Sequence, residues 1–238
     1  NDLQTLPIVG IELEKSWVDA RESIEDLAKT NAIITTTELW KICENHGITD
    51  PLDQKDLSQL FHDLGIFLHF QAAENEEATL LSKIVILQNS WATKAVYRVL
   101  KSEFLEKQKR GHFKLKDIQK VWHTCNKVDD ADYSPYTVEL LQLMQKFKIC
   151  YKIQKTKSYI LPQLLPPSPP NDHNFPAGES LQMRYSYDFM PKGILTRLTV
   201  EMHELIARKQ TLAWRDGFVL EANGAVAEVV ETYGKREI

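Results

Sequence analysis

The pattern that decides the fold lies in residues 57–70, Leu57-Ser58-Gln59-Leu60-Phe61-His62-Asp63-Leu64-Gly65-Ile66-Phe67-Leu68-His69-Phe70. Apolar side chains recur at helical spacing up to Leu64, Gly65 suits a helix end, and a short apolar run follows. Residues 140–153 repeat this pattern 83 positions later. The paired apolar positions are Leu57 and Leu140, Leu60 and Leu143, Phe61 and Met144, Leu64 and Phe147, Ile66 and Ile149, and Phe70 and Ile153. The pattern therefore predicts an internal duplication.

Around the first copy, the sequence predicts further helices and a hairpin. Trp17 and Ile24 fall on one face of a first helix. Residues 35–38, Thr-Thr-Thr-Glu, offer a capping box at the start of a second helix. Two short apolar runs, 66–70 and 83–87, are joined by a polar loop and predict a hairpin, although this loop is longer than usual.

The same order of elements is predicted around the second copy. A helix carries Trp91, a short strand covers 111–115, and a second helix carries Ile118. The helix of the repeated pattern then leads to a hairpin of 149–153 with 158–161. Helix, short strand, helix, helix, hairpin is the order of a winged helix, and it is predicted twice.

A proline-rich segment separates two parts of different composition. Six of the ten prolines lie between residues 162 and 176. Such a segment favours extended backbone and cannot form a central strand. We interpret it as a spacer, with a proline-rich binding motif as the open alternative. The predicted organisation is a mainly helical domain at 1–165, a linker at 166–177 and a β-rich domain at 178–238.

After the proline-rich segment, the spacing of apolar residues changes from helical to alternating. Met183, Tyr185, Tyr187 and Phe189 alternate with polar residues. This alternation predicts a half-buried strand. A helix is predicted after Pro191, then a hairpin at 212–220 with an Asp-Gly turn signal, and a strand at 225–230. The fold class is therefore α+β: a helical subdomain with two winged-helix-like repeats, then an antiparallel sheet with one helix, incomplete at its C-terminal edge.

Composition excludes several classes of protein. The chain has 238 residues, 29 basic and 33 acidic, for a net charge of −4, and 43% of its residues are hydrophobic. A disordered chain and a strongly basic nucleic-acid binder do not fit these values. No apolar run is long enough to span a membrane. Three widely spaced cysteines without a Cys-x-x-Cys pair favour a reducing compartment, and we expect a cytoplasmic piece of a longer protein.

Motifs that carry catalysis are missing from the sequence. There is no phosphate loop, no Gly-x-Gly-x-x-Gly, no Gly-x-Ser-x-Gly and no His-Glu-x-x-His. The string 126–129, Asn-Lys-Val-Asp, matches the guanine-reading motif of small GTPases, but it follows a helical run and is interpreted as a coincidence. His123 with Cys125, and the acidic loop 74–77, do not reach the ligand sets of a zinc or a calcium site. No catalytic, cofactor-binding or metal-ligating residue is predicted.

Nucleic-acid binding is the alternative that winged helices raise. The third helix of each repeat would enter the groove of DNA. In the first repeat this helix carries Asp53, Asp56 and Asp63, which repel phosphate, and in the second it is close to neutral with Glu139 and Lys146. Because phosphate contacts supply most non-specific affinity, these helices are poor readers of DNA, and no nucleic-acid partner is expected.

Several separate motifs resemble one known family. They are Gln88 to Leu100, Gly111-His112-Phe113, Leu140 to Tyr151, Tyr159 to Pro166 and Arg184 to Gly193. In this order they resemble the COR domain (C-terminal of Roc) of Roco proteins, especially prokaryotic ones, which are related to the leucine-rich repeat kinases. In that family leucine-rich repeats precede a Ras-like Roc GTPase domain, and COR follows Roc.

The resemblance implies a regulatory and dimerisation domain. The first part would be COR-A, which packs on Roc in the same chain, and the second COR-B, which contacts the COR domain of a second subunit. GTP or GDP with Mg²⁺ would bind in the adjacent Roc domain, outside these residues. Tyr185, Phe189 and Arg197 are the expected coupling or interface residues; ordinary half-buried strand positions are the alternative for Tyr185 and Phe189. Trp214 is either an exposed interface anchor or a core residue.

One departure from the family affects the expected oligomer. COR-B domains of the family continue past the equivalent of Ile238, so we expect this chain to be a monomer or a weak dimer. The chain itself is not expected to be an enzyme, although its parent would be a GTPase and could also carry a kinase domain. A winged-helix nucleic-acid-binding protein and an interaction adaptor without a GTPase link are the competing readings.

Overall fold

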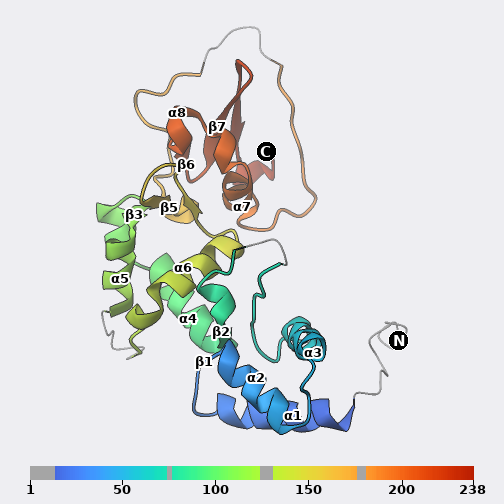
Figure 1. The fold of residues 1–238 in the computed structure, drawn as a ribbon. Helices are drawn as coiled ribbons and strands as arrows, with labels where there is room; N and C mark the ends of the chain where they lie inside the picture. Colours follow the sequence, from blue (N-terminus) through green and yellow to red (C-terminus); the bar gives the residue numbers. More distant parts are fainter. Residues whose placement is uncertain (1–13, 74–76, 124–130, 176–180) are drawn as a thin grey trace. The chain divides into compact units, whose positions relative to one another are not determined.

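A computed structural model of the chain describes residues 14–73, 77–123, 131–175 and 181–238 (Figure 1). The chain forms two compact units, an N-terminal unit of residues 1–94 and a C-terminal unit of residues 95–238, and each is described by itself. The guanine-motif string 126–129, Cys125, most of the acidic loop 74–77 and Pro176 lie outside the described residues.

The N-terminal unit is helical with a small sheet. Its elements are α1 (Lys15–Ala28), β1 (Ile33–Thr35), α2 (Thr36–Asn45), α3 (Pro51–Asp63), the 3₁₀ turn η2 (Leu81–Lys83) and β2 (Ile84–Ile86). The predicted capping box is confirmed: the Glu38 backbone N–H donates to Thr35 Oγ1 at 3.2 Å, and the Thr35 N–H donates to Glu38 Oε2 at 2.7 Å. These two hydrogen bonds fix where α2 begins.

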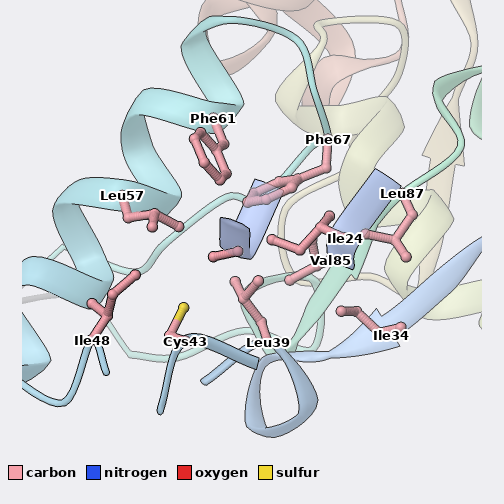
Figure 2. Packing of buried hydrophobic residues seen from close by; sticks show 11 residues of the cluster. Ile24, Ile34, Leu39, Cys43, Ile48, Leu57, Phe61, Phe67, Val85 and Leu87 are labelled. Atoms are coloured by element: carbon pink, nitrogen blue, oxygen red, sulfur yellow. The ribbon is translucent and has the colours of Figure 1, made fainter. Parts of the chain in front are cut away.

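One apolar cluster holds the N-terminal unit together. Its buried members are Ala20, Ile24, Ile34, Leu39, Cys43, Ile48, Leu57, Phe61, Phe67, Val85 and Leu87. They come from all three helices, both strands and the segment after α3, and their side chains point toward one another (Figure 2). Phe61 and Phe67 meet edge to face with ring centroids 5.9 Å apart. The first copy of the repeated pattern therefore supplies part of the core, as its apolar spacing predicts.

The hairpin predicted from residues 66–70 and 83–87 is wrong in its main pairing. Strand β2 pairs antiparallel with β1, and the 66–70 run adds only one bridge, Leu68 to Ile86. The backbone N–H of His69 donates instead to His62 Nδ1 at 3.3 Å.

The C-terminal unit begins within α4 (Asn89–Leu100), which crosses the boundary between the units. Its elements up to the proline-rich segment are the π-helical turn η3 (Phe104–Gln108), β3 (His112–Lys114), α5 (Leu115–His123), η4 (Ser134–Tyr136), α6 (Thr137–Lys146), β4 (Tyr151–Lys152), β5 (Ser158–Ile160) and η5 (Pro162–Leu164). Beyond it lie α7 (Ile194–Glu201), η6 (His203–Leu205), α8 (Ala207–Gln210), β6 (Ala213–Trp214), β7 (Gly217–Ala222), β8 (Ala225–Val230) and η7 (Tyr233–Lys235).

The two copies of the repeated pattern end in the same backbone geometry. After α3, the Gly65 N–H donates to the His62 carbonyl; after α6, the Lys148 N–H donates to the Gln145 carbonyl, 83 positions later. Both residues have positive φ, +71° at Gly65 and +57° at Lys148. The bridge from Leu68 to β2 likewise has its counterpart in the pairing of Tyr151 with β5. Pairing and helix ends thus repeat at the same spacing as the apolar positions.

The second sheet and the third sheet share one apolar cluster. The three-stranded sheets have the orders β3-β5-β4 and β6-β7-β8. The cluster contains Tyr151, Ile153, Ile160, Leu165, Leu195, Val200, Ile206, Ala213 and Phe218. Its members come from the β4–β5 hairpin, from α7 and from the β6–β7 hairpin. The apolar core therefore continues across the proline-rich segment.

Of the strands predicted in the last third of the chain, some are confirmed and one is wrong. The hairpin at 212–220 and the strand at 225–230 are confirmed as β6–β7 and β8. A side chain at Gly217 would clash with the Trp214 ring, so this position requires glycine. The half-buried strand predicted at 183–189 is wrong: the segment makes one bridge, Ser186 to Glu237, and most of its apolar side chains are exposed. No sheet covers it, so the alternation of polar and apolar residues produces no buried face.

The two equivalent helix ends predict opposite effects of substitution. Gly65→Ala should destabilise the N-terminal unit by about 1 kcal/mol, because a residue with Cβ resists positive φ and nothing else lies within 4 Å. Lys148→Gly should be neutral to stabilising by up to about 1 kcal/mol, since relief of strain offsets the exposed Lys148–Glu201 ion pair. Urea unfolding measures both. Gly234→Ala is the control, because Gly234 has an ordinary φ and nothing lies within 4 Å of an added Cβ. If this substitution lowered the stability as much as Gly65→Ala, positive φ could not be the cause.

Burial of His69 predicts acid sensitivity. Its Nε2 faces the Ser82 carbonyl at 3.2 Å and must donate, so Nδ1 accepts from the Ser58 hydroxyl at 2.6 Å and the ring is neutral. Burial lowers the pKa of His69. As pH falls below the unfolded value of about 6.5, the unfolded chain binds the proton first, and stability is lost by at most about 1.4 kcal/mol per pH unit. His69→Phe should flatten this slope in urea unfolding from pH 7.5 to 5; an unchanged slope would exclude His69 as its source.

Candidate protein interface

Four of the five most exposed large apolar side chains among the described residues lie in one short segment; the fifth is Leu52 on α3. Leu181 is 91% exposed, Met183 67%, Tyr185 59% and Phe189 79%. We call these four residues the apolar strip. Large apolar side chains that stand this far out of the surface and follow one another along a single segment are typical of an interaction site.

Residues 185–188 of this segment are held by hydrogen bonds to residues 236–238. The Tyr185 N–H donates to the Ile238 carbonyl at 2.8 Å, and the Ile238 N–H donates back to the Tyr185 carbonyl at 3.0 Å. The Tyr187 N–H donates to the Arg236 carbonyl, and the Arg236 guanidinium donates to the Asp188 carbonyl at 2.6 Å. Because the backbone is fixed, the exposed side chains are presented without a large further cost in backbone entropy.

The turn after the strip leads into α7. Met190 is buried and anchors the turn, while Gly193 adopts φ +90° at the N-terminus of the helix. Arg197 lies one turn into α7, where its N–H donates to the Gly193 carbonyl and its side chain is exposed. Among the described residues, no hydrogen bond or ion pair joins Arg197 to Tyr185 or Phe189. The structure thus exposes all three predicted residues but joins none of them to another by a hydrogen bond or ion pair among the described residues.

Trp214 is a core residue. It is 3% exposed and packs with Ala207, Leu212 and Val219. The ring centroids of His173 and Trp214 are 5.6 Å apart. The core-packing alternative therefore describes this side chain, and the exposed-anchor alternative does not.

A strained turn joins the two sheets of the C-terminal unit, and sequence reasoning missed it. Arg208, Lys209 and Gln210 have φ of +52°, +56° and +70°. Each left-handed residue other than glycine costs about 1–2 kcal/mol. Arg, Lys and Gln are good helix formers, so no local signal marks this turn. We call these three residues the left-handed turn.

Contacts with the β4–β5 hairpin hold the left-handed turn. Gln210 is 4% exposed, its carbonyl accepts from the Tyr151 hydroxyl at 3.0 Å, and its Oε1 accepts from the Gln154 N–H at 2.6 Å. Gln210 Nε2 is buried without a hydrogen-bond partner in the described structure. Burial raises the pKa of Tyr151, so its hydroxyl remains a donor. Two hydrogen bonds worth about 1 kcal/mol each cannot offset the strain alone, so packing around Gln210 must do the rest.

The proline-rich segment is tied to the third sheet. The Arg215 N–H donates to the Pro166 carbonyl at 2.8 Å, Arg208 pairs with Asp172 at 2.7 Å, and His173 Nε2 lies 2.8 Å from Glu228 Oε1. A free spacer would make no such contacts. The segment is an anchored connection.

A metal-ligand cluster or an activated thiol would mark a reactive centre among the described residues. No group of three or more His, Cys, Asp or Glu side chains that could hold a metal ion is found among them. Burial raises the pKa of the Cys43 thiol to about 11 and that of Cys150 further, so neither is a ready nucleophile. Within the same residues, no helix is both long enough and apolar enough to cross a membrane.

Comparisons with known proteins agree with this architecture. The family "C-terminal of Roc, COR-A domain" matches residues 14–165, and "C-terminal of Roc, COR-B domain" matches residues 178–238. The structure is similar to that of Methanosarcina barkeri Roco2 RocCORdC bound to GDP, with a TM-score of 0.58 and 28% identity, over 69% of this chain and 48% of that one.

Curated relatives come from Dictyostelium discoideum. The probable serine/threonine-protein kinase roco7 is 27% identical over 86% of this chain and 8% of its own length. The probable serine/threonine-protein kinase qkgA is 23% identical over 72% of this chain and 11% of its own. The chain thus spans about a tenth of the length of these relatives. Both family matches, in order and over most of the chain, show that it belongs to the COR (C-terminal of Roc) family of Roco proteins.

Proposed function

We propose that this chain is the regulatory, dimerisation-linked part of a Roco GTPase, and that it couples the nucleotide state of an adjacent Roc domain to the arrangement of two subunits. The observation that carries the proposal is the apolar strip, held by hydrogen bonds to residues 236–238, in a chain that matches both COR-A and COR-B. GTP or GDP with Mg²⁺ would bind in Roc, and this chain would read that state through surface contacts.

The exposure of the strip supports a protein contact at Tyr185 and Phe189. If Tyr185 and Phe189 were half-buried strand residues, packing within the chain would explain them. Their side chains are instead 59% and 79% exposed. An aromatic residue contributes a large apolar area at a small cost in side-chain entropy, which suits the centre of an interface. Arg197 on α7 could add an ion pair at its edge.

The left-handed turn supports transmission of a signal through the C-terminal unit. It lies between α7 and β6, and its contacts reach back to the β4–β5 hairpin. Strain of this kind persists only while the surrounding contacts hold it, so a change in those contacts would release the turn. If Roc contacts the chain differently with GDP and with GTP, that difference biases the turn and the sheet attached to it.

The required energy is modest. Coupling between two sites typically amounts to about 1–3 kcal/mol, which is about a 5- to 150-fold difference in affinity. Loss of contacts by one or two exposed aromatic residues supplies this amount. The strip therefore suffices as the source of a nucleotide-dependent affinity.

This proposal predicts a nucleotide-dependent complex. The chain should bind a purified Roc domain of the same protein with affinities that differ at least a few-fold between GDP and a non-hydrolysable GTP analogue, measured by calorimetry. Tyr185→Ala with Phe189→Ala should weaken binding by tenfold or more and leave the unfolding transition unchanged, because neither side chain is buried.

Val226→Ala is the control, since Val226 is 54% exposed on β8, in the second part of the chain and away in sequence from the strip. It should leave binding unchanged. Equal affinity in both nucleotide states would make the chain a passive platform. Absence of binding would favour an adaptor without a GTPase link, and binding of DNA with a steep salt dependence would favour the nucleic-acid reading.

A further inference from the structure

The two repeats carry opposite charge. Residues 1–94 contain 7 basic and 16 acidic residues, a net charge of −9. Residues 95–165 contain 14 basic and 7 acidic residues, a net charge of +7, and residues 166–238 contain 8 and 10, a net charge of −2. A net charge of −4 for the whole chain therefore conceals two strongly charged parts of opposite sign.

Exposed lysines gather at one end of the β3-β5-β4 sheet. Lys152 on β4 pairs with Tyr159 of β5, so Lys152 and Lys157 lie on the same face of the sheet. Lys155 lies within the hairpin turn between them at φ +56°. All three are exposed, and none forms an ion pair with a carboxylate among the described residues. We call these three residues the lysine cluster; Lys114 on β3 pairs with Ser158 and lies on the opposite face.

Nothing in the surrounding sequence neutralises the cluster. No Asp or Glu occurs between Glu139 and Asp172. Some other charged residues of the second repeat are paired locally, as Lys109 with Asp117 and Lys107 with Glu103. The hairpin tip 154–158, Gln-Lys-Thr-Lys-Ser, has no apolar side chain that could enter a bilayer, so its contribution to binding is electrostatic.

A complementary surface lies on α3 of the N-terminal unit. Asp53, Asp56 and Asp63 follow one another at spacings of three and seven residues, which places them on one face of the helix. All three are exposed, and none pairs with Lys or Arg among the described residues; Asp63 accepts only from Gln59 at 2.9 Å. We call these three residues the acidic face.

The opposite charges occupy corresponding places in the duplication. With the shift of 83 residues, Asp63 corresponds to Lys146 and Glu74 corresponds to Lys157. A helix that would read DNA is unsuited in the second repeat, because on α6 only the last residue, Lys146, is exposed. The second repeat therefore offers no exposed recognition helix to a duplex.

We infer that the lysine cluster of one chain binds the acidic face of a second copy. Complementary patches steer association and fix the orientation of two proteins more than they add affinity. Three exposed ion pairs contribute about 0.2–1 kcal/mol each, so the contact is weak in isolation. It would orient two subunits that are held together elsewhere, since tethering raises the effective concentration.

Sedimentation velocity of the whole chain tests this contact. In about 20 mM NaCl the weight-average sedimentation coefficient should rise with protein concentration, and in about 300 mM NaCl it should not, because salt screens exposed charges. Lys152→Glu with Lys155→Glu and Lys157→Glu should abolish the rise. The same number of reversals elsewhere on the N-terminal unit, Lys41→Glu with Lys83→Glu and Lys94→Glu, changes the net charge equally and should retain it.

The strongest test mixes two variants that should not associate on their own. Asp56→Lys with Asp63→Lys should also abolish association. An equimolar mixture of this variant with the lysine-cluster variant should restore it, because each reversed surface then meets an opposite charge on the other chain. Tyr185→Ala with Phe189→Ala should leave the salt-sensitive association intact, which separates this contact from the proposed Roc contact.

Three outcomes would overturn the inference. One is a monomer at every concentration in low salt. Another is association that both charge variants retain. The third is binding of the lysine cluster to vesicles containing phosphatidylserine or to a DNA duplex without any self-association, which would assign it to a different polyanion.

Discussion

The C-terminal unit depends on one apolar cluster in which the β4–β5 hairpin and the β6-β7-β8 sheet share side chains. Tyr151 and Ile160 from the hairpin pack with Leu195 and Phe218 from the following elements. A two-stranded hairpin or a three-stranded sheet with one covered face is marginal on its own. Because the hairpin and the sheet bury these side chains against each other, unfolding of one exposes apolar surface of the other, even though composition changes between them.

This dependence gives the left-handed turn its importance. Gln210 is buried at the edge of the same arrangement and contacts the hairpin through its carbonyl and its side chain. Strain of about 3–6 kcal/mol over three residues is a sizeable fraction of the stability of a small domain. It persists because the surrounding core fixes both neighbouring segments, with Ala207 and Leu212 buried on either side. A change in the conformation of the β4–β5 hairpin therefore alters the contacts that hold the left-handed turn. A change in the turn likewise alters contacts of the hairpin.

The sequence predicted what local patterns determine. The spacing of Leu57 and Phe61, the capping box at Thr35 and the strand at 225–230 each depend on neighbours within a few residues. The left-handed turn could not be predicted, because its conformation is set by contacts with residues more than fifty positions away. The strand predicted at 183–189 failed for a related reason: alternation indicates a buried face only where a second layer exists to cover it.

The duplicated architecture separates what the fold requires from what it leaves free. Core positions of the two copies stay apolar, since Leu57 and Leu140 are both nearly inaccessible, and their helix ends keep the same hydrogen bonds. Exposed positions carry no such constraint: Asp63 corresponds to Lys146, and the net charges reach −9 and +7. Separating charge to this degree increases self-repulsion within each part and adds nothing to the packing of either core. Folding therefore gives no reason for the separation, and its cause must lie in what the two charged surfaces contact.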